Sequence, residues 1–290
     1  MNGIILVDKP QGFTSHDVVA KLRGILHERR IGHSGTLDPM ATGLLVVFIG
    51  RATRAVEFAE SHEKEYLAGL RPGIETDTQD ITGTVLKDSG KAVTANQLSA
   101  LLPEFTGEIM QIPPMYSAIK VNGQKLYDLA RSGVEIERKS RAVTIKKLEI
   151  LDEEAGDYTI RVVCSKGTYI RTLVHDIGQR LGTGAALSSL RRTVAGNFSI
   201  SDAHTIDEIR ELFEKGELDK ILLPVDMLFA EYPSVKISEK QLKKCLCGNC
   251  FETSETNGKY RVYDENGGFL MLGNVENGIM STVKSFFEVQ

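Results

Sequence analysis

GHSGTLDPMATG, residues 32–43, is the stretch that decides the fold of this chain, and the apolar run LLVVFI, residues 44–49, follows it at once. The glycines and the proline of the first part predict an irregular loop, whereas the second part is typical of a buried strand. We therefore expect Asp38 in a tight loop directly before a rigid element. Such a place lets a scaffold hold a single reactive side chain firmly.

The residues around Asp38 leave its role open. A carboxylate in such a loop can act as a nucleophile or as a general base. An Asp followed by a proline, here Pro39, is also a common start of a helix, with the Asp as N-cap. The strand expected at residues 44–49 weakens the helix-cap interpretation, because no helix then begins at Pro39.

The composition is ordinary for a globular protein of 290 residues, with 41% hydrophobic and 26% charged residues. This length favours one large domain, alone or with a small one. No apolar run approaches the roughly 18 residues of a membrane span, and four cysteines argue against a disulfide framework. Residues 1–9 contain an acid and lack a cleavage site, so we expect a first strand, no signal peptide and a cytoplasmic protein.

The net charge of −4 argues against a nucleic-acid partner, but the charges are unevenly distributed. Residues 114–147 carry eight Lys or Arg and three Asp or Glu. A basic face binds phosphates even on an acidic protein, although a solvated charged surface is the alternative interpretation. The candidate RNA-binding cations of this segment are Lys120, Lys125, Arg131 and Arg141.

Hydrophobic periodicity and turn residues predict both strands and helices, which makes the fold class α+β. The expected strands are 1–9, 44–49, 64–71, 142–151 and 157–164, and the expected helices are 17–26, 94–102 and one that ends near residue 181. Prolines at residues 224 and 233 mark the expected domain boundary. The glycine-containing turns after it predict a small all-β module.

Arg171 is the natural counter-ion for Asp38, since a buried guanidinium keeps a carboxylate ionised and oriented. We expect it where a strand gives way to a helix, beside Lys166 and Tyr169. A structural ion pair and a phosphate contact are the alternatives for Arg171.

Two further residues are ambiguous. Tyr66 is either a core or surface aromatic or a platform that stacks on a base. His33 is either structural or, beside a nucleic acid, a wedge or a phosphate contact. A carboxylate, an arginine partner, an aromatic platform and a basic segment together fit base chemistry on RNA.

No pattern in the sequence predicts a metal ion or a nucleotide cofactor. Asp77 and Asp80 fit a turn with side-chain caps better than a magnesium site. Cys245, Cys247 and Cys250 cluster, but zinc needs four ligands and no histidine is close to them in sequence. We therefore expect no metal and no cofactor.

The chain resembles the bacterial TruB family, the tRNA pseudouridine-55 synthases, over essentially its whole length. Residues 32–39 resemble the catalytic motif of that family and residues 165–172 its arginine motif. The other segments that carry the resemblance are residues 2–12, 64–66, 76–80 and 114–118.

The resemblance implies a pseudouridine synthase fold, in which a mixed, mainly antiparallel sheet is flanked by helices and loops. Residues 1–230 would form the catalytic domain, with residues 114–141 as a mobile loop that clasps RNA. Residues 231–290 would form a small PUA-like RNA-binding domain. The cysteines of this last module depart from the motif of the family, which leaves its RNA contacts open.

Individual roles also follow from the resemblance. Asp38 would be the nucleophile, Arg171 its partner, and Tyr66 the residue that stacks on the flipped uracil and is a candidate proton shuttle. His33 would hold the extruded nucleotides, and Lys9 with Pro10 would support the site from the neighbouring strand.

The implied reaction isomerises uridine 55 in the T stem-loop of tRNA to pseudouridine, without a cofactor, after the base is flipped out. Whether the carboxylate first attacks C6, attacks C1′ or takes a proton from C2′ stays open. We expect a monomer that needs no guide RNA and no membrane. The alternatives are a non-catalytic tRNA-binding or tRNA-folding protein on the same scaffold and a guide-RNA-dependent synthase.

Overall fold

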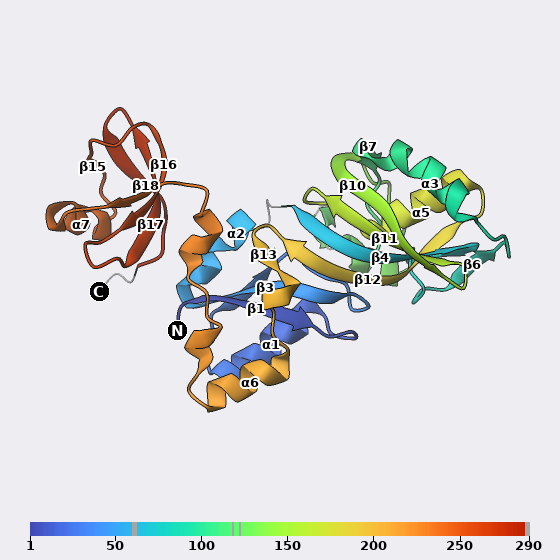
Figure 1. Cartoon of the computed structure of the whole chain (residues 1–290), viewed down its shortest axis with the longest axis horizontal. Helices are drawn as coiled ribbons and strands as arrows, with labels where there is room; N and C mark the ends of the chain where they lie inside the picture. Colours follow the sequence, from blue (N-terminus) through green and yellow to red (C-terminus); the bar gives the residue numbers. More distant parts are fainter. Residues whose placement is uncertain (60–62, 118, 122, 288–290) are drawn as a thin grey trace.

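The computed structural model describes residues 1–59, 63–117, 119–121 and 123–287. The side chains of Lys120, Lys125 and Arg131, expected to bind RNA, lie outside this described part. Figure 1 shows two neighbouring sheet-and-helix halves and a separate C-terminal module at one end of the molecule.

A large mixed sheet forms the centre of the fold. Within the described residues it has nine strands, of which seven follow the order β1-β3-β12-β4-β11-β10-β7, while β2 pairs with β3 and β13 with β12. Its strands are β1 Gly3–Lys9, β2 Ile31–Ser34, β3 Thr42–Ile49, β4 Lys64–Pro72, β7 Gly107–Gln111, β10 Arg141–Glu154, β11 Asp157–Cys164, β12 Ala185–Ala195 and β13 Phe198–Ser199. The pairing of β3 with β12 is parallel and the other printed pairings of this sheet are antiparallel.

Helices cover both halves of this sheet. The α-helices are α1 Ser15–Leu26, α2 Val56–Ala59, α3 Ala95–Leu101, α4 Leu126–Arg131, α5 Ile170–Leu181, α6 Ile206–Glu214 and α7 Glu239–Leu246. Short 3₁₀ helices are η1 Gly50–Ala55, η2 Leu102–Phe105, η3 Ile200–Asp202, η4 Leu218–Lys220 and η5 Val225–Phe229. Two small hairpins, β5 Ile74–Thr76 with β6 Val85–Asp88 and β8 Lys120–Val121 with β9 Gln124–Lys125, lie outside the main sheet. No helix of the described residues is long and apolar enough to cross a membrane.

The local sequence explains why the elements begin and end where they do. Helix α1 starts at a capping box in which Thr14 Oγ1 accepts from the backbone N–H of Asp17 and the Asp17 carboxylate accepts from the backbone N–H of Thr14. Strand β3 is almost entirely buried because β1, β2 and β12 all pair with it, which confirms the strand predicted at residues 44–49.

Two predicted boundaries differ from the structure. The stretch 32–43 is not a loop throughout, because residues 32–34 belong to β2 and pair with β3. The hairpin after β10 is tighter than expected, since its strands reach Glu154 and Asp157. Ala155 and Gly156 both have positive φ angles, 51° and 85°, which is the geometry of a two-residue turn between antiparallel strands.

The parallel contact between β3 and β12 joins the two halves of the molecule. One core packs β1 and β3 against α1 and α6, and another packs β4 and β11 against α3 and α5. The loop that carries Asp38 precedes β3 in the first half, whereas Tyr66 and Arg171 belong to the second half. The fold therefore brings candidate site residues together across this seam.

The C-terminal module is a five-stranded sheet in the order β14-β16-β17-β18-β15. Its strands are β14 Ser234–Lys236, β15 Phe251–Glu252, β16 Gly258–Tyr263, β17 Phe269–Glu276 and β18 Ile279–Ser285. The module also contains helix α7, which was not predicted and which Ser238 and Gln241 cap reciprocally. Cys245 on this helix is buried, whereas Cys247 and Cys250 are exposed.

The module shares a hydrophobic core with the large sheet. Phe229 in η5 packs against Phe58 and against Phe269 and Phe286 of the module, with ring centroids 5.2–6.2 Å apart. Tyr263 donates a 2.5 Å hydrogen bond to the Asp226 carboxylate from the other side of the expected boundary. Apolar burial thus continues across residues 230 and 231.

Candidate active site

Hydrogen bonds of its backbone to residues 12 and 15 hold the loop that carries Asp38 in place. Leu37 donates its backbone N–H to Ser15 Oγ at 2.9 Å, and the Pro39 carbonyl accepts from the backbone N–H of Gly12 at 2.8 Å. The Asp38 carbonyl accepts from the backbone N–H of Ala41 at 3.0 Å, and the chain then enters β3. Asp38 is therefore in a turn before a strand, and it caps no helix.

Asp38 and Arg171 form an ion pair. Arg171 Nε lies 2.9 Å from Asp38 Oδ2, with 38% of the Asp38 side chain exposed and 6% of the Arg171 side chain exposed. Arg171 is the second residue of α5, directly after the strand-to-helix turn at Tyr169. The predicted pairing is thus present, and its geometry exposes the carboxylate while it buries the guanidinium.

Three further acceptors surround the Arg171 guanidinium. It donates to the backbone carbonyls of Thr78 at 3.0 Å and Tyr116 at 2.8 Å, and Asp80 Oδ2 lies 3.8 Å from its Nε. Three segments of the chain therefore hold the Arg171 side chain in a single orientation. Such multiple, charge-assisted contacts fix the direction of the ion pair.

Asp80 is part of a capped turn, as predicted. Its Oδ1 accepts from the hydroxyl of Thr78 at 2.8 Å and from the backbone N–H of Thr82 at 2.9 Å, and Asp77 Oδ1 accepts from the backbone N–H of Thr84 at 2.8 Å. Sequence reasoning missed that this turn also supplies Arg171 with the Thr78 carbonyl and a second carboxylate. The sequence of residues 76–80 indicated only a capped turn and a resemblance to the TruB family, without a role for Thr78 or Asp80 beside Arg171.

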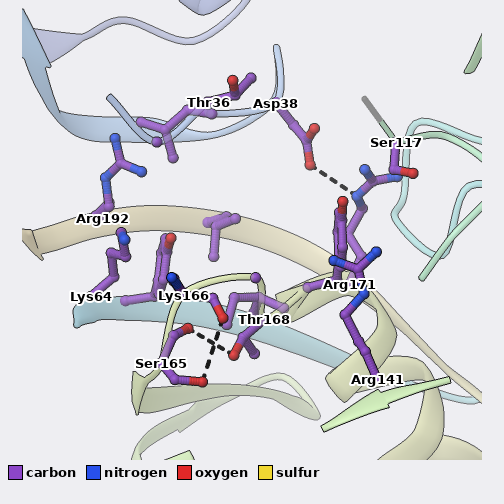
Figure 2. A pocket seen from close by; sticks show the side chains of 17 residues that line it. Thr36, Asp38, Lys64, Ser117, Arg141, Ser165, Lys166, Thr168, Arg171 and Arg192 are labelled. Atoms are coloured by element: carbon purple, nitrogen blue, oxygen red, sulfur yellow. Dashed lines mark hydrogen bonds and ion pairs between the residues drawn. The ribbon is translucent and has the colours of Figure 1, made fainter. Parts of the chain in front are cut away.

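A cavity of about 490 Å³ opens around Asp38. Figure 2 shows Asp38 and Arg171 facing each other at one side of it, with Arg192 and Lys64 at the other. The lining residues are Gly35, Thr36, Leu37, Asp38, Lys64, Tyr66, Ser117, Arg141, Ser165, Lys166, Gly167, Thr168, Tyr169, Ile170, Arg171, Leu190 and Arg192. Among the described residues, the lining contains five cationic side chains and one carboxylate, so the cavity favours an anionic ligand.

Several predicted residues line this cavity. Tyr66 is buried on β4, and burial raises the pKa of its phenol. Lys166 and Tyr169 lie on the turn before α5, and the Arg141 guanidinium lies 6.0 Å from the centre of the Tyr169 ring. The cavity thus brings together the Asp38 loop, Tyr66, Arg141 and the segment 165–171, which are separate in the sequence.

Other predicted residues lie outside the lining. Lys9 is fully buried, donates to the carbonyls of Pro10 at 3.0 Å and Phe13 at 2.6 Å, and has a pKa that burial lowers to about 8. Pro10 is exposed in the turn that follows. His33 packs its ring 5.3 Å from that of His16, and burial lowers its pKa to about 4.

Sequence reasoning missed Lys64, Ser117 and Arg192 as lining residues. Arg192 is 1% exposed, and its Nε donates to the Leu44 carbonyl at 2.7 Å. The two consecutive arginines in the otherwise apolar and small-residue strand β12 were a usable signal, because successive side chains of a strand point to opposite faces. Because β12 lies in the sheet interior, this alternation predicts that one of Arg191 and Arg192 points into the molecule.

Comparisons with known proteins agree with this geometry. A family model for TruB family pseudouridylate synthase (N terminal domain) matches residues 23–170, and one for the tRNA pseudouridylate synthase B C-terminal domain matches residues 171–230. The tRNA pseudouridine synthase B of Stutzerimonas stutzeri is 44% identical over 280 residues, covering 95% of this chain and 92% of the relative. That of Clostridium kluyveri is 40% identical over 292 residues, covering 99% and 100%.

Solved structures with the same fold point in the same direction. One described as "Structure of H/ACA RNP bound to a substrate RNA containing 2'-deoxyuridine" has a TM-score of 0.75 and 25% identity, covering 99% of this chain and 86% of that chain. One described as "Crystal Structure of a Cbf5-Nop10-Gar1 Complex" has a TM-score of 0.75 and 27% identity, covering 99% and 85%. The expected α+β pseudouridine synthase fold is confirmed. The chain belongs to the TruB family of tRNA pseudouridine synthases and is an isomerase that modifies tRNA.

Proposed function

We propose that this enzyme isomerises uridine 55 in the T stem-loop of tRNA and that Asp38 is its nucleophile. The observation that carries this proposal is the 2.9 Å ion pair between Asp38 Oδ2 and the buried Arg171 guanidinium, placed in a cavity with an excess of positive charge. The ion pair limits the rotation of the Asp38 carboxylate at the cavity.

The reaction needs an ionised carboxylate against one face of the nucleotide. The N1–C1′ glycosidic bond breaks, the uracil turns in the cavity, a bond forms between C5 and C1′, and the proton on C5 leaves while N1 gains one. No other atom is added or lost. Attack of Asp38 at C6, attack at C1′ and removal of a C2′ proton all begin from the same ionised group.

The target nucleotide has to leave its stack to reach Asp38, since the carboxylate lies within a cavity. Tyr66 lines the same cavity and offers an aromatic face for the flipped base. Its phenol is our candidate for the group that takes the C5 proton. Arg141 and Lys166 at the lining supply positive charge for the phosphates of the extruded strand.

The enzyme is proposed to act as a monomer without guide RNA, with residues 114–141 as its own RNA clasp. Support comes from the Tyr116 carbonyl, which accepts directly from Arg171, so that the expected clasp reaches the ion pair. The relatives at 40–44% identity are named tRNA pseudouridine synthase B. The solved structures are described as an H/ACA RNP at 25% identity and as a Cbf5-Nop10-Gar1 complex at 27% identity. Residues 231–290 are proposed to bind RNA as a PUA-like domain.

The test uses purified enzyme and unmodified tRNA that carries 5-tritiated uridine, with no guide RNA. Tritium release equal to one atom per tRNA, together with pseudouridine mapped to position 55, would support the proposal. Release from another position would reject the U55 specificity. Release only after addition of a guide RNA would support the guide-dependent alternative, and tight binding without any release would support a non-catalytic tRNA-binding protein.

A further inference from the structure

Arg192 and Tyr66 are direct neighbours across two paired strands. In the antiparallel pairing of β12 with β4, Arg192 is opposite Tyr66, so both side chains project from the same face of the sheet. Both side chains also line the cavity around Asp38. The register of the sheet thus places a guanidinium beside the phenol that we propose as proton acceptor.

The Arg192 guanidinium is buried with unused hydrogen-bonding capacity. Its Nε donates to the Leu44 carbonyl, but its Nη2 is buried and has no hydrogen-bond partner among the described residues. Within the described residues no carboxylate forms an ion pair with it. A buried, incompletely paired guanidinium is costly, so its place in the cavity lining indicates a functional role.

The chain makes room for this guanidinium under the Asp38 loop. A Cβ atom at Gly35 would come within 3.0 Å of Arg192 Nη1, and Gly35 has a positive φ of 64°. Any other residue at position 35 would push against the guanidinium. The Asp38 loop and the Arg192 side chain are thus packed against each other.

The surroundings of Tyr66 shift the pKa of its phenol in two opposite directions. Burial is the largest influence and raises the pKa of the Tyr66 phenol, whereas the charge of Arg192 and a hydrogen bond from its side chain act to lower it. A buried phenol on its own is a poor proton acceptor, because its phenolate form is disfavoured. A neighbouring cation offsets part of that cost.

We propose that Arg192 is a positioning residue whose hydrogen bond to the Tyr66 phenol oxygen is kept in the RNA-bound enzyme and stabilises the phenolate form of Tyr66. This inference rests on the proposed function. The phenolate takes the proton from C5 after the C5–C1′ bond has formed. The electron pair of the C5–H bond restores the C5–C6 double bond of the base, the π pair of the C6=N1 bond moves to N1, and N1 gains a proton from water. If Asp38 has added to C6, the C6–O bond breaks in place of the C6=N1 π bond. The resulting phenol then returns its proton to water.

The test compares single-turnover rates over pH for the wild type and for Arg192→Met, Arg192→Lys and Tyr66→Phe. We expect the wild-type rate to rise with pH along a limb that Tyr66→Phe abolishes. Arg192→Met should move this limb up by at least one pH unit, while Arg192→Lys, which keeps the charge, should move it less. The affinity for tRNA should change less than about threefold, which corresponds to less than about 0.7 kcal/mol of binding free energy.

Arg191→Met is the matched control, because Arg191 is the next residue on β12 and pairs with Asp8 at 2.8 Å, away from the cavity lining. It should leave the pH limb in place. In the Tyr66→Phe background, Arg192→Met should have no further effect on the rate. Independent, multiplicative losses in this double variant would overturn the inference, as would weaker tRNA binding with an unchanged pH limb.

These outcomes are separate from failure of the proposed function. If Asp38→Asn retains activity, the nucleophile is wrong whatever Arg192 does. If Asp38→Asn is inactive and the Arg192 and Tyr66 variants act independently, the proposed function stands and the inference falls. If Arg192→Met does not fold, the pH limb of Arg192→Lys is compared with that of Arg191→Met. A limb shifted upwards only in Arg192→Lys supports the inference, and equal limbs overturn it.

Discussion

Arg171 Nε lies 2.9 Å from Asp38 Oδ2, while the same guanidinium donates to the carbonyls of Thr78 and Tyr116. One side chain therefore connects the Asp38 loop, the capped turn at residues 76–84, the expected RNA clasp and helix α5. A change in any of these segments acts on the direction of the carboxylate through Arg171.

Arg171→Lys keeps the charge but removes the planar fork that reaches several acceptors at once. We expect kcat for tritium release to fall by about 100-fold or more, as with the loss of a preorganised electrostatic contact. The affinity for tRNA should change little, because the Arg171 side chain is buried, with 6% of it exposed. A normal kcat in this variant would show that a point charge is sufficient.

Arg141 lines the cavity and is expected to meet a phosphate. Replacing it by Gln should weaken tRNA binding and reduce the slope of log Kd against log salt by about one. Lys147→Gln on the same strand is the control with the same loss of charge, because Lys147 pairs with Glu149 at 2.9 Å and does not line the cavity. Equal slopes for the two variants would show that only net charge matters.

His33 makes stability depend on pH in the acidic range. Burial lowers its pKa from 6.5 to about 4, so between these values the unfolded chain binds a proton that the folded chain does not. The unfolding free energy therefore falls as pH drops from about 6.5 to about 4, by at most about 1.4 kcal/mol per pH unit for one proton.

The measurement for His33 is urea unfolding at a series of pH values. His33→Gln should show a flatter dependence than the wild type in this window and a similar one above pH 7. Parallel curves for the two proteins would contradict the buried neutral imidazole.

Phe229 connects the large sheet to the C-terminal module. It is 2% exposed and packs against aromatic rings on both sides. Phe229→Ala should lower the unfolding free energy by about 3–5 kcal/mol. Met227→Ala, two residues away and 42% exposed, is the control and should cost far less. A small loss for Phe229→Ala would mean that the module packs independently.

Most of the site was predictable because the residues involved carry unusual local patterns. Asp38 lies between glycines and a buried strand, and Arg171 opens a helix directly after a strand. The two consecutive arginines of β12 indicate that one of them points inwards, but the contact of Arg192 with Tyr66 depends on the register between β12 and β4, which are far apart in the sequence. The Tyr116 carbonyl has no sequence signature, since every residue has one.

The elements that were missed have similar causes. Strand β2 exists because it pairs with β3, a contact that local periodicity does not contain. Helix α7 is short and highly charged, and its capping box at Ser238 and Gln241 was the signal that could have identified it. The shared core around Phe229 depends on how the module docks, which no local pattern describes.

The most direct test of the central claim is tritium release by Asp38→Asn from tRNA that carries 5-tritiated uridine. Asn keeps the size of the side chain and removes the charge that pairs with Arg171. We predict no release above background over many turnovers of the wild type, with tRNA affinity retained. Release at a rate close to that of the wild type would contradict Asp38 as the nucleophile.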